Sequence, residues 1–109
     1  MQGKKELVIS GNVANTFTDS VKATILNYEK TLFYIKNTHA SNALKYSIML
    51  SPDGNLVSPT WHIILSGVSL TAGVEGKHKL SDPWDVAKFQ TMNNASGTVA
   101  TCVAYINRK

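Results

Sequence analysis

The amino-acid sequence predicts an all-β protein: a single-domain antiparallel β-sandwich, immunoglobulin-like or jelly-roll-like, spanning residues 1–109. Three observations predict it. Apolar and polar residues alternate with a period of two in most segments. These segments are rich in β-branched and aromatic residues, which favour strands. Turn signals separate them at intervals of roughly 8 to 14 residues, a spacing typical of sandwiches and barrels.

The strands can be justified in order along the chain. In residues 6–10, Leu7 and Ile9 share one face and alternate with Val8. Residues 19–28 could begin a helix at an Asp or Ser cap, but their Val, Thr and Ile residues are poor helix formers and favour a strand. The later strands alternate more regularly and lie in residues 32–35, 44–51, 61–66 and 99–106.

The turn Ser51-Pro52-Asp53-Gly54 contains an acidic residue that could bind a metal or simply turn the chain. Proline presets the backbone angle at the second turn position, and Asp followed by Gly completes a type I or bulged hairpin turn. A calcium loop would need several further oxygen ligands at close spacing, and the sequence offers only Asn55 nearby. We therefore expect Asp53 to act as a turn residue.

Basic residues are concentrated at the two chain ends. The chain has 11 basic and 7 acidic residues, and 4 of the basic ones are terminal, so the remainder is balanced. This argues against a nucleic-acid partner, because nucleic-acid binders usually show a basic face with interleaved aromatics. We expect the terminal residues to attach the protein to an acidic surface: Lys4, Lys5, Arg108 and Lys109.

The sequence carries no targeting or membrane signal that we recognise. Residues 1–6 lack the apolar region of a signal peptide. No apolar run approaches the ~20 residues that span a bilayer. Synthesis in a cytosol and no membrane partner are therefore expected. The single cysteine, Cys102, lies in an apolar strand and is expected to be a buried hydrophobe rather than a reactive thiol.

Residues for catalysis or metal binding are scarce. His39, His62 and His78 lie in separate segments without HxH or HExxH spacing. The close pair Asp82 and Asp85 could serve a glycosidase, but Asp82 precedes Pro83 as a turn opener. No Gly-x-Ser-x-Gly or phosphate-binding glycine loop occurs. The sequence therefore predicts a non-enzyme without cofactor or metal, a metal-dependent enzyme being the less favoured alternative.

Aromatic residues offer a second function. Trp61 and Trp84 each begin a predicted strand, and Tyr34 lies within one. Exposed aromatic rings can stack on sugars, which would make the protein a carbohydrate-binding or adhesin-like module. Tryptophans at strand starts more often seal the end of a core, and we favour a core or interface position here.

Several strands are apolar or small on both faces, which predicts assembly. Residues 63–65 and 32–35 are continuous apolar runs, and Ala100, Cys102 and Ala104 form a second smooth face. The wet face of a sandwich sheet should be polar. A small domain with extra apolar surface usually buries it against copies of itself or a host surface. Ile64, with His62 facing solvent or a neighbouring subunit, is therefore a candidate interface residue.

Three segments carry a resemblance to a known group of proteins. Residues 33–38 (Phe-Tyr-Ile-Lys-Asn-Thr), 44–48 (Leu-Lys-Tyr-Ser-Ile) and 51–54 (Ser-Pro-Asp-Gly) resemble small β-sandwich domains of phage and phage-like particles. Fibronectin-like and adhesin-like modules show similar motifs. The viral resemblance implies a capsid decoration, head-fibre or tail protein in the virion, made in the host cytoplasm. Its partners would be copies of itself and a major capsid or tail protein, and it implies no catalytic residues.

Strand exchange offers a mechanism for such assembly. Edge strands pair readily with other chains. The terminal segments Lys5–Gly11 and Val99–Asn107 are therefore candidates for exchange between subunits.

Overall fold

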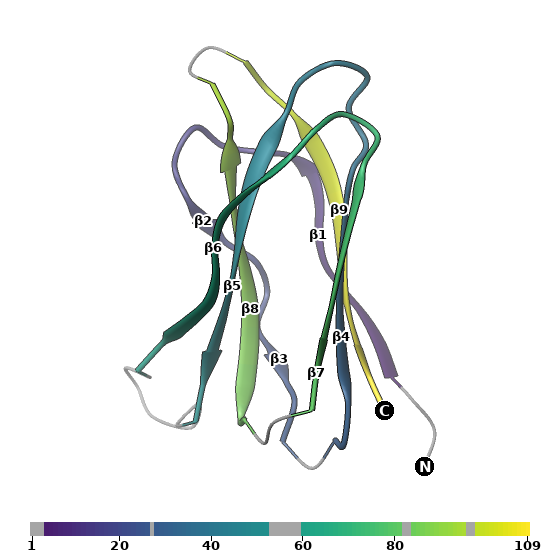
Figure 1. Ribbon diagram of the computed structural model, residues 1–109, viewed down its shortest axis with the longest axis vertical. Coiled ribbons are helices and arrows are strands. Elements are labelled where there is room, and N and C mark those ends of the chain that lie inside the picture. Colours follow the sequence, from purple (N-terminus) through teal and green to yellow (C-terminus); the bar gives the residue numbers. More distant parts are fainter. Residues whose placement is uncertain (1–3, 27, 53–59, 82–83, 96–97) are drawn as a thin grey trace.

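The computed structural model describes residues 4–26, 28–52, 60–81, 84–95 and 98–109, which form two facing antiparallel sheets (Figure 1). The turn at Asp53 and the side chains of Lys4 and Asp82 lie outside the described residues. Within the described ranges there is no helix, and hence none that could cross a membrane. The strands are β1 (Lys4–Asn12), β2 (Thr18–Asp19), β3 (Ala23–Thr24), β4 (Thr31–Asn37), β5 (Leu44–Ser51), β6 (His62–Leu70), β7 (Glu75–Leu80), β8 (Val86–Asn93) and β9 (Thr101–Arg108).

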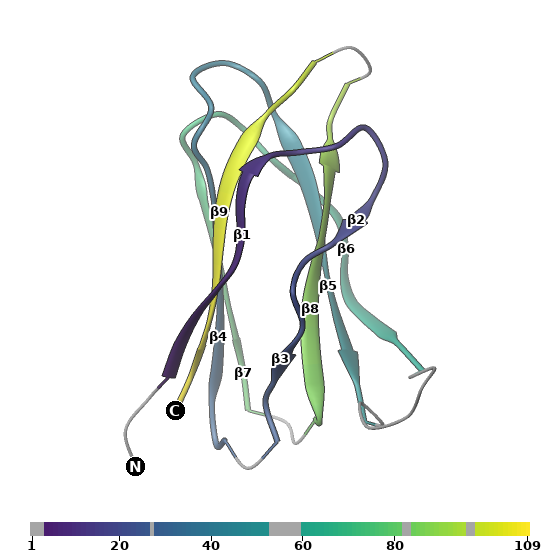
Figure 2. The same ribbon diagram turned by 180° about the vertical axis from the view of Figure 1, so that it is seen from behind.

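The strand order identifies a jelly roll. One sheet has the order β1-β9-β4-β7 and the other β2-β8-β5-β6, with β3 also paired to β8 (Figures 1 and 2). If β2 and β3 are counted as one interrupted strand, each sheet has four strands. The first strand pairs with the last, whereas in an immunoglobulin fold it pairs with the second. Of the two sandwich types that the sequence leaves open, the structure is the jelly roll with its two Greek keys.

The core lies between the sheets and follows the predicted alternation. β4 and β9 bury every second residue, and β5 buries Leu44, Tyr46, Ile48 and Leu50. The rings of Phe33 and Phe89 meet edge to face across the core, with their centroids 5.8 Å apart. Burying such side chains contributes roughly 1.5 to 3 kcal/mol each relative to exposure. The predicted sandwich is therefore confirmed, and in β5 the face that the sequence predicted to be apolar is the buried one.

β1 departs from the predicted alternation. Its register with β9 shifts between Leu7 and Ile9, which marks a β-bulge. Val8 is consequently turned into the core at 4% exposure, whereas Leu7 is 50% exposed. The prediction that Leu7 and Ile9 share the apolar face is thus wrong, because a single extra residue inverts the alternation within one strand.

The segment after β1 forms strand rather than helix, as the sequence favoured. Only two residue pairs at each of β2 and β3 continue the ladder with β8. Between them Ser20 maintains the contact, because its N–H donates to the Phe89 carbonyl at 2.9 Å and its Oγ accepts from the Phe89 N–H at 2.9 Å. The serine side chain therefore stands in for a backbone acceptor where the strand is interrupted.

Two expectations about the last strand are wrong. β9 lies inside its sheet, paired with β1 on one side and β4 on the other, so Val99–Asn107 offers no free edge for exchange. Ala100, Cys102 and Ala104 face the core and are at most 2% exposed. Their small size lets the two sheets approach and does not create an apolar outer surface. β1 is an edge strand, as its proposed exchange would require.

Candidate functional site

β6 is an edge strand without aspartate, glutamate, lysine or arginine. It is the last strand of its sheet and pairs only with β5 among the described strands. His62 is the one ionisable residue among its nine, and Ile63 and Ile64 are 58% and 41% exposed. The edges of the other sheet differ, because β1 begins with two lysines and β7 carries Glu75, Lys77 and Lys79. Charges on edge strands discourage pairing with other chains, and β6 lacks that protection.

A bulge divides β6 into two parts. The register with β5 shifts on both sides of Ile48, and Gly67 has a φ of 57°, a left-handed conformation that glycine adopts without strain. The Gly67 N–H donates to Ser47 Oγ at 2.9 Å. The first shift falls at Ser66 and Gly67 and the second at Ile64, which has no cross-strand partner between Ile63 and Leu65, so the exposed apolar side chains lie in the irregular first half of β6.

Trp61, His62 and Trp84 gather at the start of β6. Trp84 packs against the core, and its ring lies 5.5 Å from that of His62, which is exposed as predicted. Lys88 Nζ lies 4.2 Å from the centroid of the Trp61 ring, which is a cation–π contact. Trp84 thus seals the end of the core, in line with the favoured prediction. Together with Ile63 and Ile64, these three residues form the surface that we call the β6 patch.

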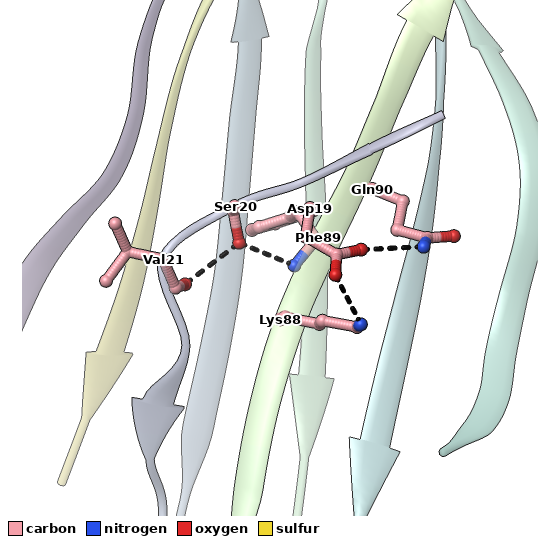
Figure 3. A network of polar contacts seen from close by, with 6 residues as sticks. All are labelled: Asp19, Ser20, Val21, Lys88, Phe89 and Gln90. Atoms are coloured by element: carbon pink, nitrogen blue, oxygen red, sulfur yellow. Dashed lines mark hydrogen bonds and ion pairs between the residues drawn. The ribbon is translucent and has the colours of Figure 1, made fainter. Parts of the chain in front are cut away.

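Lys88 is buried beside the β6 patch in a polar network (Figure 3). Its Nζ donates to Asp19 Oδ2 at 2.8 Å, and Gln90 Nε2 donates to Asp19 Oδ1 at 2.7 Å. Partial burial favours the neutral form of Asp19, but these hydrogen bonds and the charges of Lys88 and Lys22 outweigh it and lower the pKa of Asp19. The carboxylate stays ionised and holds β2 on β8, which is a structural role.

Tyr34 lies on the opposite sheet. It points outward from β4, beside Tyr105 of β9, with ring centroids 6.0 Å apart. Trp61 contacts Lys88, which is on β8 in the other sheet. The structure therefore does not bring Tyr34 together with Trp61 and Trp84 on one sugar-binding platform, because strand order, invisible to local sequence, assigns them to different sheets.

Arg108 is not an attachment residue. It is 3% exposed, its Nη2 bonds Glu6 Oε1 at 2.7 Å, and its Nη1 donates to the Thr24 carbonyl at 2.6 Å. It belongs to the inward set of β9, as its alternation with Ile106 could have indicated. Two of the other candidate attachment residues, Lys5 and Lys109, are exposed.

The histidines do not assemble a metal centre. No group of three or more His, Cys, Asp or Glu residues among the described positions is placed to hold a metal ion. His39 Nδ1 accepts hydrogen bonds from two backbone N–H groups of its own loop. His78 Nε2 lies 2.7 Å from Tyr46 Oη inside the sandwich. Burial raises the pKa of Tyr46 and lowers the pKa of His78, so this pair is neutral at pH 7 and serves packing.

Cys102 is buried, as predicted. Burial raises the pKa of its thiol to about 11, so very little thiolate exists at neutral pH. Because the thiolate is the reactive form, this cysteine is chemically inert.

Comparison with known proteins identifies the fold. No protein-family model matches the sequence, and no curated protein sequence matches it significantly. Solved structures do match. The VP2 subviral particle of infectious bursal disease virus has a TM-score of 0.58 at 12% identity, covering 98% of this chain and 32% of that one. The SPBc2 prophage-derived protein YomS has a TM-score of 0.57 at 12% identity, covering 99% and 94%.

A third match comes from the Bacillus endospore appendages, described as disulfide-linked pili, with a TM-score of 0.57 at 14% identity and coverages of 99% and 87%. Identities this low show a common fold and do not show a common function. The chain spans about a third of the length of the VP2 chain but nearly all of YomS. The resemblance to phage and viral particle domains is therefore present at the level of fold, as a weak similarity.

Proposed function

We propose that this protein is a non-enzymatic structural subunit of a viral or phage-like particle, such as a capsid decoration, head-fibre or tail component. In this proposal it is made in the host cytoplasm and incorporated into the virion. Its partners are copies of itself and a major capsid or tail protein, and it engages neither membrane nor nucleic acid. The β6 patch is the surface through which it assembles.

The observation that carries this proposal is the partly apolar edge at β6, which contains no aspartate, glutamate, lysine or arginine. A neighbouring strand could pair with residues 62–65 and cover Ile63 and Ile64 at the same time. Burying their exposed area would contribute about 1 to 2 kcal/mol per side chain. If two copies pair symmetrically, each contact occurs twice. Jelly rolls are common among viral capsid domains, and the folds of VP2 and YomS support the same reading.

Light scattering across a concentration series tests the assembly surface. We expect a defined oligomer whose mass falls to that of the monomer when Ile63 is replaced by lysine, because the new charge would be buried at the edge. Val21→Lys is the matched control, since Val21 is 60% exposed on another part of the molecule.

The control variant should keep the oligomer. Equal dissociation of both variants, or a wild-type protein that stays monomeric both alone and when mixed with purified capsid or tail shells, would refute assembly through β6.

A further inference from the structure

The outer face of the β1-β9-β4-β7 sheet gathers lysines that are dispersed in the sequence. Cross-strand pairs place Lys5 opposite Asn107, Leu32 opposite Lys79 and Tyr34 opposite Lys77. All of these alternate with core residues and therefore point outward. We call this surface the lysine face; its charged residues among those described are Lys5, Lys30, Lys36, Lys77, Lys79 and Lys109, with Glu29 and Glu75 as its acids.

The fold thereby collects positive charge on one face of the molecule. Among the described residues, six of the lysines and two acidic residues, Glu29 and Glu75, belong to the lysine face. The lysine face therefore carries a formal charge of +4 among the described residues, six lysines against two acids. The prediction that the basic residues gather at the chain ends is therefore incomplete. The register of β4 and β7 places Lys36, Lys77 and Lys79 on the same face as the terminal lysines, and backbone hydrogen bonds hold Lys30 beside Lys109.

An aromatic groove runs through the lysine face. Tyr34, Tyr105 and Leu32 line a shallow pocket of about 200 Å³ together with Lys5 and Asn107. Leu32 and Asn107 also line an adjoining pocket of about 160 Å³, whose rim includes Lys30, Lys79 and Lys109. The two pockets share a wall and are bordered by lysines, so a ligand longer than one pocket would meet alternating apolar and cationic contacts.

One buried acceptor in the groove has no hydrogen-bond donor among the described residues. Asn107 Oδ1 is buried and accepts no hydrogen bond from the described residues. A buried acceptor without a donor is costly, and a ligand hydroxyl reached by a small side-chain rotation would satisfy it. Partial burial and the nearby carboxylate of Glu75 raise the pKa of Tyr34, so that ring stays neutral. The groove therefore offers hydrogen bonds as well as charge.

The composition of the face discriminates among anionic partners. Protein interfaces are typically depleted of lysine and enriched in arginine, and the lysine face has six lysines and no arginine among its described residues. Single-stranded nucleic acid needs free aromatic faces for successive bases, but Lys5 Nζ lies 4.2 Å from the Tyr105 ring centroid and covers that ring. A sugar ring needs one flat apolar wall and polar groups at its edges, which the pocket provides.

We propose that the lysine face binds an anionic polysaccharide, a chain of sugar rings that carry carboxylate or sulfate groups. A ring lies against Tyr34 and Leu32, its hydroxyls reach Asn107, and its anionic groups lie between Lys5 and Lys79. The groove is on the sheet opposite to β6, so ligand binding and assembly use separate surfaces.

Binding of defined polymers tests this proposal. The probes are polygalacturonate and dextran sulfate, with methyl-esterified polygalacturonate and plain dextran as neutral controls and a thymidine 20-mer as the nucleic-acid arm. We expect at least one anionic polysaccharide to bind about tenfold or more tightly than its neutral control and the oligonucleotide. Because surface charges are screened by salt, affinity should fall steeply between about 50 and 500 mM NaCl.

Matched variants localise the site. Lys5→Gln with Lys79→Gln should weaken binding about tenfold, and Tyr34→Ala should weaken it without changing its salt dependence. Lys22→Gln with Lys45→Gln removes the same charge elsewhere and should bind like wild type. Unchanged binding by the first pair, no binding of either anionic polysaccharide, or equal binding of the oligonucleotide would overturn the proposal. The native mass of the Lys5/Lys79 variant should match wild type, which separates this test from that of β6 assembly.

Discussion

At the residue scale, one close contact fixes the identity of Gly76. A Cβ at this position would lie 2.5 Å from Tyr46 Oη and 3.1 Å from Tyr46 Cζ. Tyr46 is 2% exposed and held by His78, so it cannot move aside freely. Packing across the sandwich therefore requires a glycine at this position of β7. Its backbone conformation does not, because the φ of Gly76 is not positive.

A double-mutant cycle tests this contact. Gly76→Ala should lower the free energy of unfolding by about 1 to 3 kcal/mol, the usual range for overpacking. Tyr46→Phe alone should cost about 1 kcal/mol through its lost hydrogen bond. In the double variant the nearest clashing atom is gone, so the combined loss should be smaller than the sum. Urea denaturation measures all three, and additive losses would show that the hydroxyl is not what excludes a side chain.

At the element scale, two buried asparagines fix the strand ends. Asn37 ends β4 and donates to the carbonyls of Asn42 and Leu70 at 2.8 and 2.9 Å. Asn93 ends β8, donates to the Val13 carbonyl at 2.8 Å and accepts from the Ala100 N–H at 2.8 Å. Each amide joins loops that are distant in sequence, because its donor and acceptor groups can serve two backbone segments at once.

Removing one of these amides should destabilise the whole domain. Asn93→Ala leaves a buried carbonyl and a buried N–H without partners, and we expect a loss of about 2 to 4 kcal/mol in unfolding free energy. The adjacent Asn94 is exposed, so Asn94→Ala should stay within about 0.5 kcal/mol of wild type. Thermal and urea unfolding of both variants would check this, and similar stabilities would refute a role for Asn93 as a buried link.

At the scale of the whole molecule, Arg108 joins the two sheets. It bonds Glu6 in β1 of one sheet and the Thr24 carbonyl in β3 of the other, and its guanidinium carbon lies 5.2 Å from the Tyr28 ring centroid. Figure 2 shows β1 and β3 at the same side of the sandwich, in opposite sheets. There the Arg108 side chain links the sheets, together with the Val21 N–H, which donates to the Val8 carbonyl at 3.2 Å.

Arg108→Ala should therefore weaken the sandwich as a unit. Loss of one partner of a buried ion pair typically costs about 3 to 5 kcal/mol. The Glu6 side chain retains 30% exposure, so we expect about 2 to 4 kcal/mol here. Lys109→Ala removes an exposed neighbouring charge and should have little effect. Denaturant midpoints distinguish the two, and equal stability would show that Arg108 is dispensable for closing the sandwich.

The same scale separates the two candidate surfaces. The β6 patch lies on one sheet and the lysine face on the other, with the core between them. A particle subunit could therefore pair with its neighbours through β6 and still present the lysine face. Measuring ligand binding on the oligomer and on the Ile63→Lys variant should give the same affinity per chain if the surfaces are independent.

The sequence by itself determined the fold class and the inward face of β5, because alternation depends only on neighbouring residues. In β4 and β9 both faces are apolar or small, so local alternation left the inward face open, and pairing between the sheets decided it. It also indicated the exposed His62 and the apolar run at residues 63–65. The tertiary structure alone decided the rest. Strand order chose the jelly roll and separated Tyr34 from the tryptophans. A bulge inverted Leu7 and Val8, and cross-strand register collected dispersed lysines on one face. These features depend on pairing between segments far apart in the chain, which no local pattern specifies.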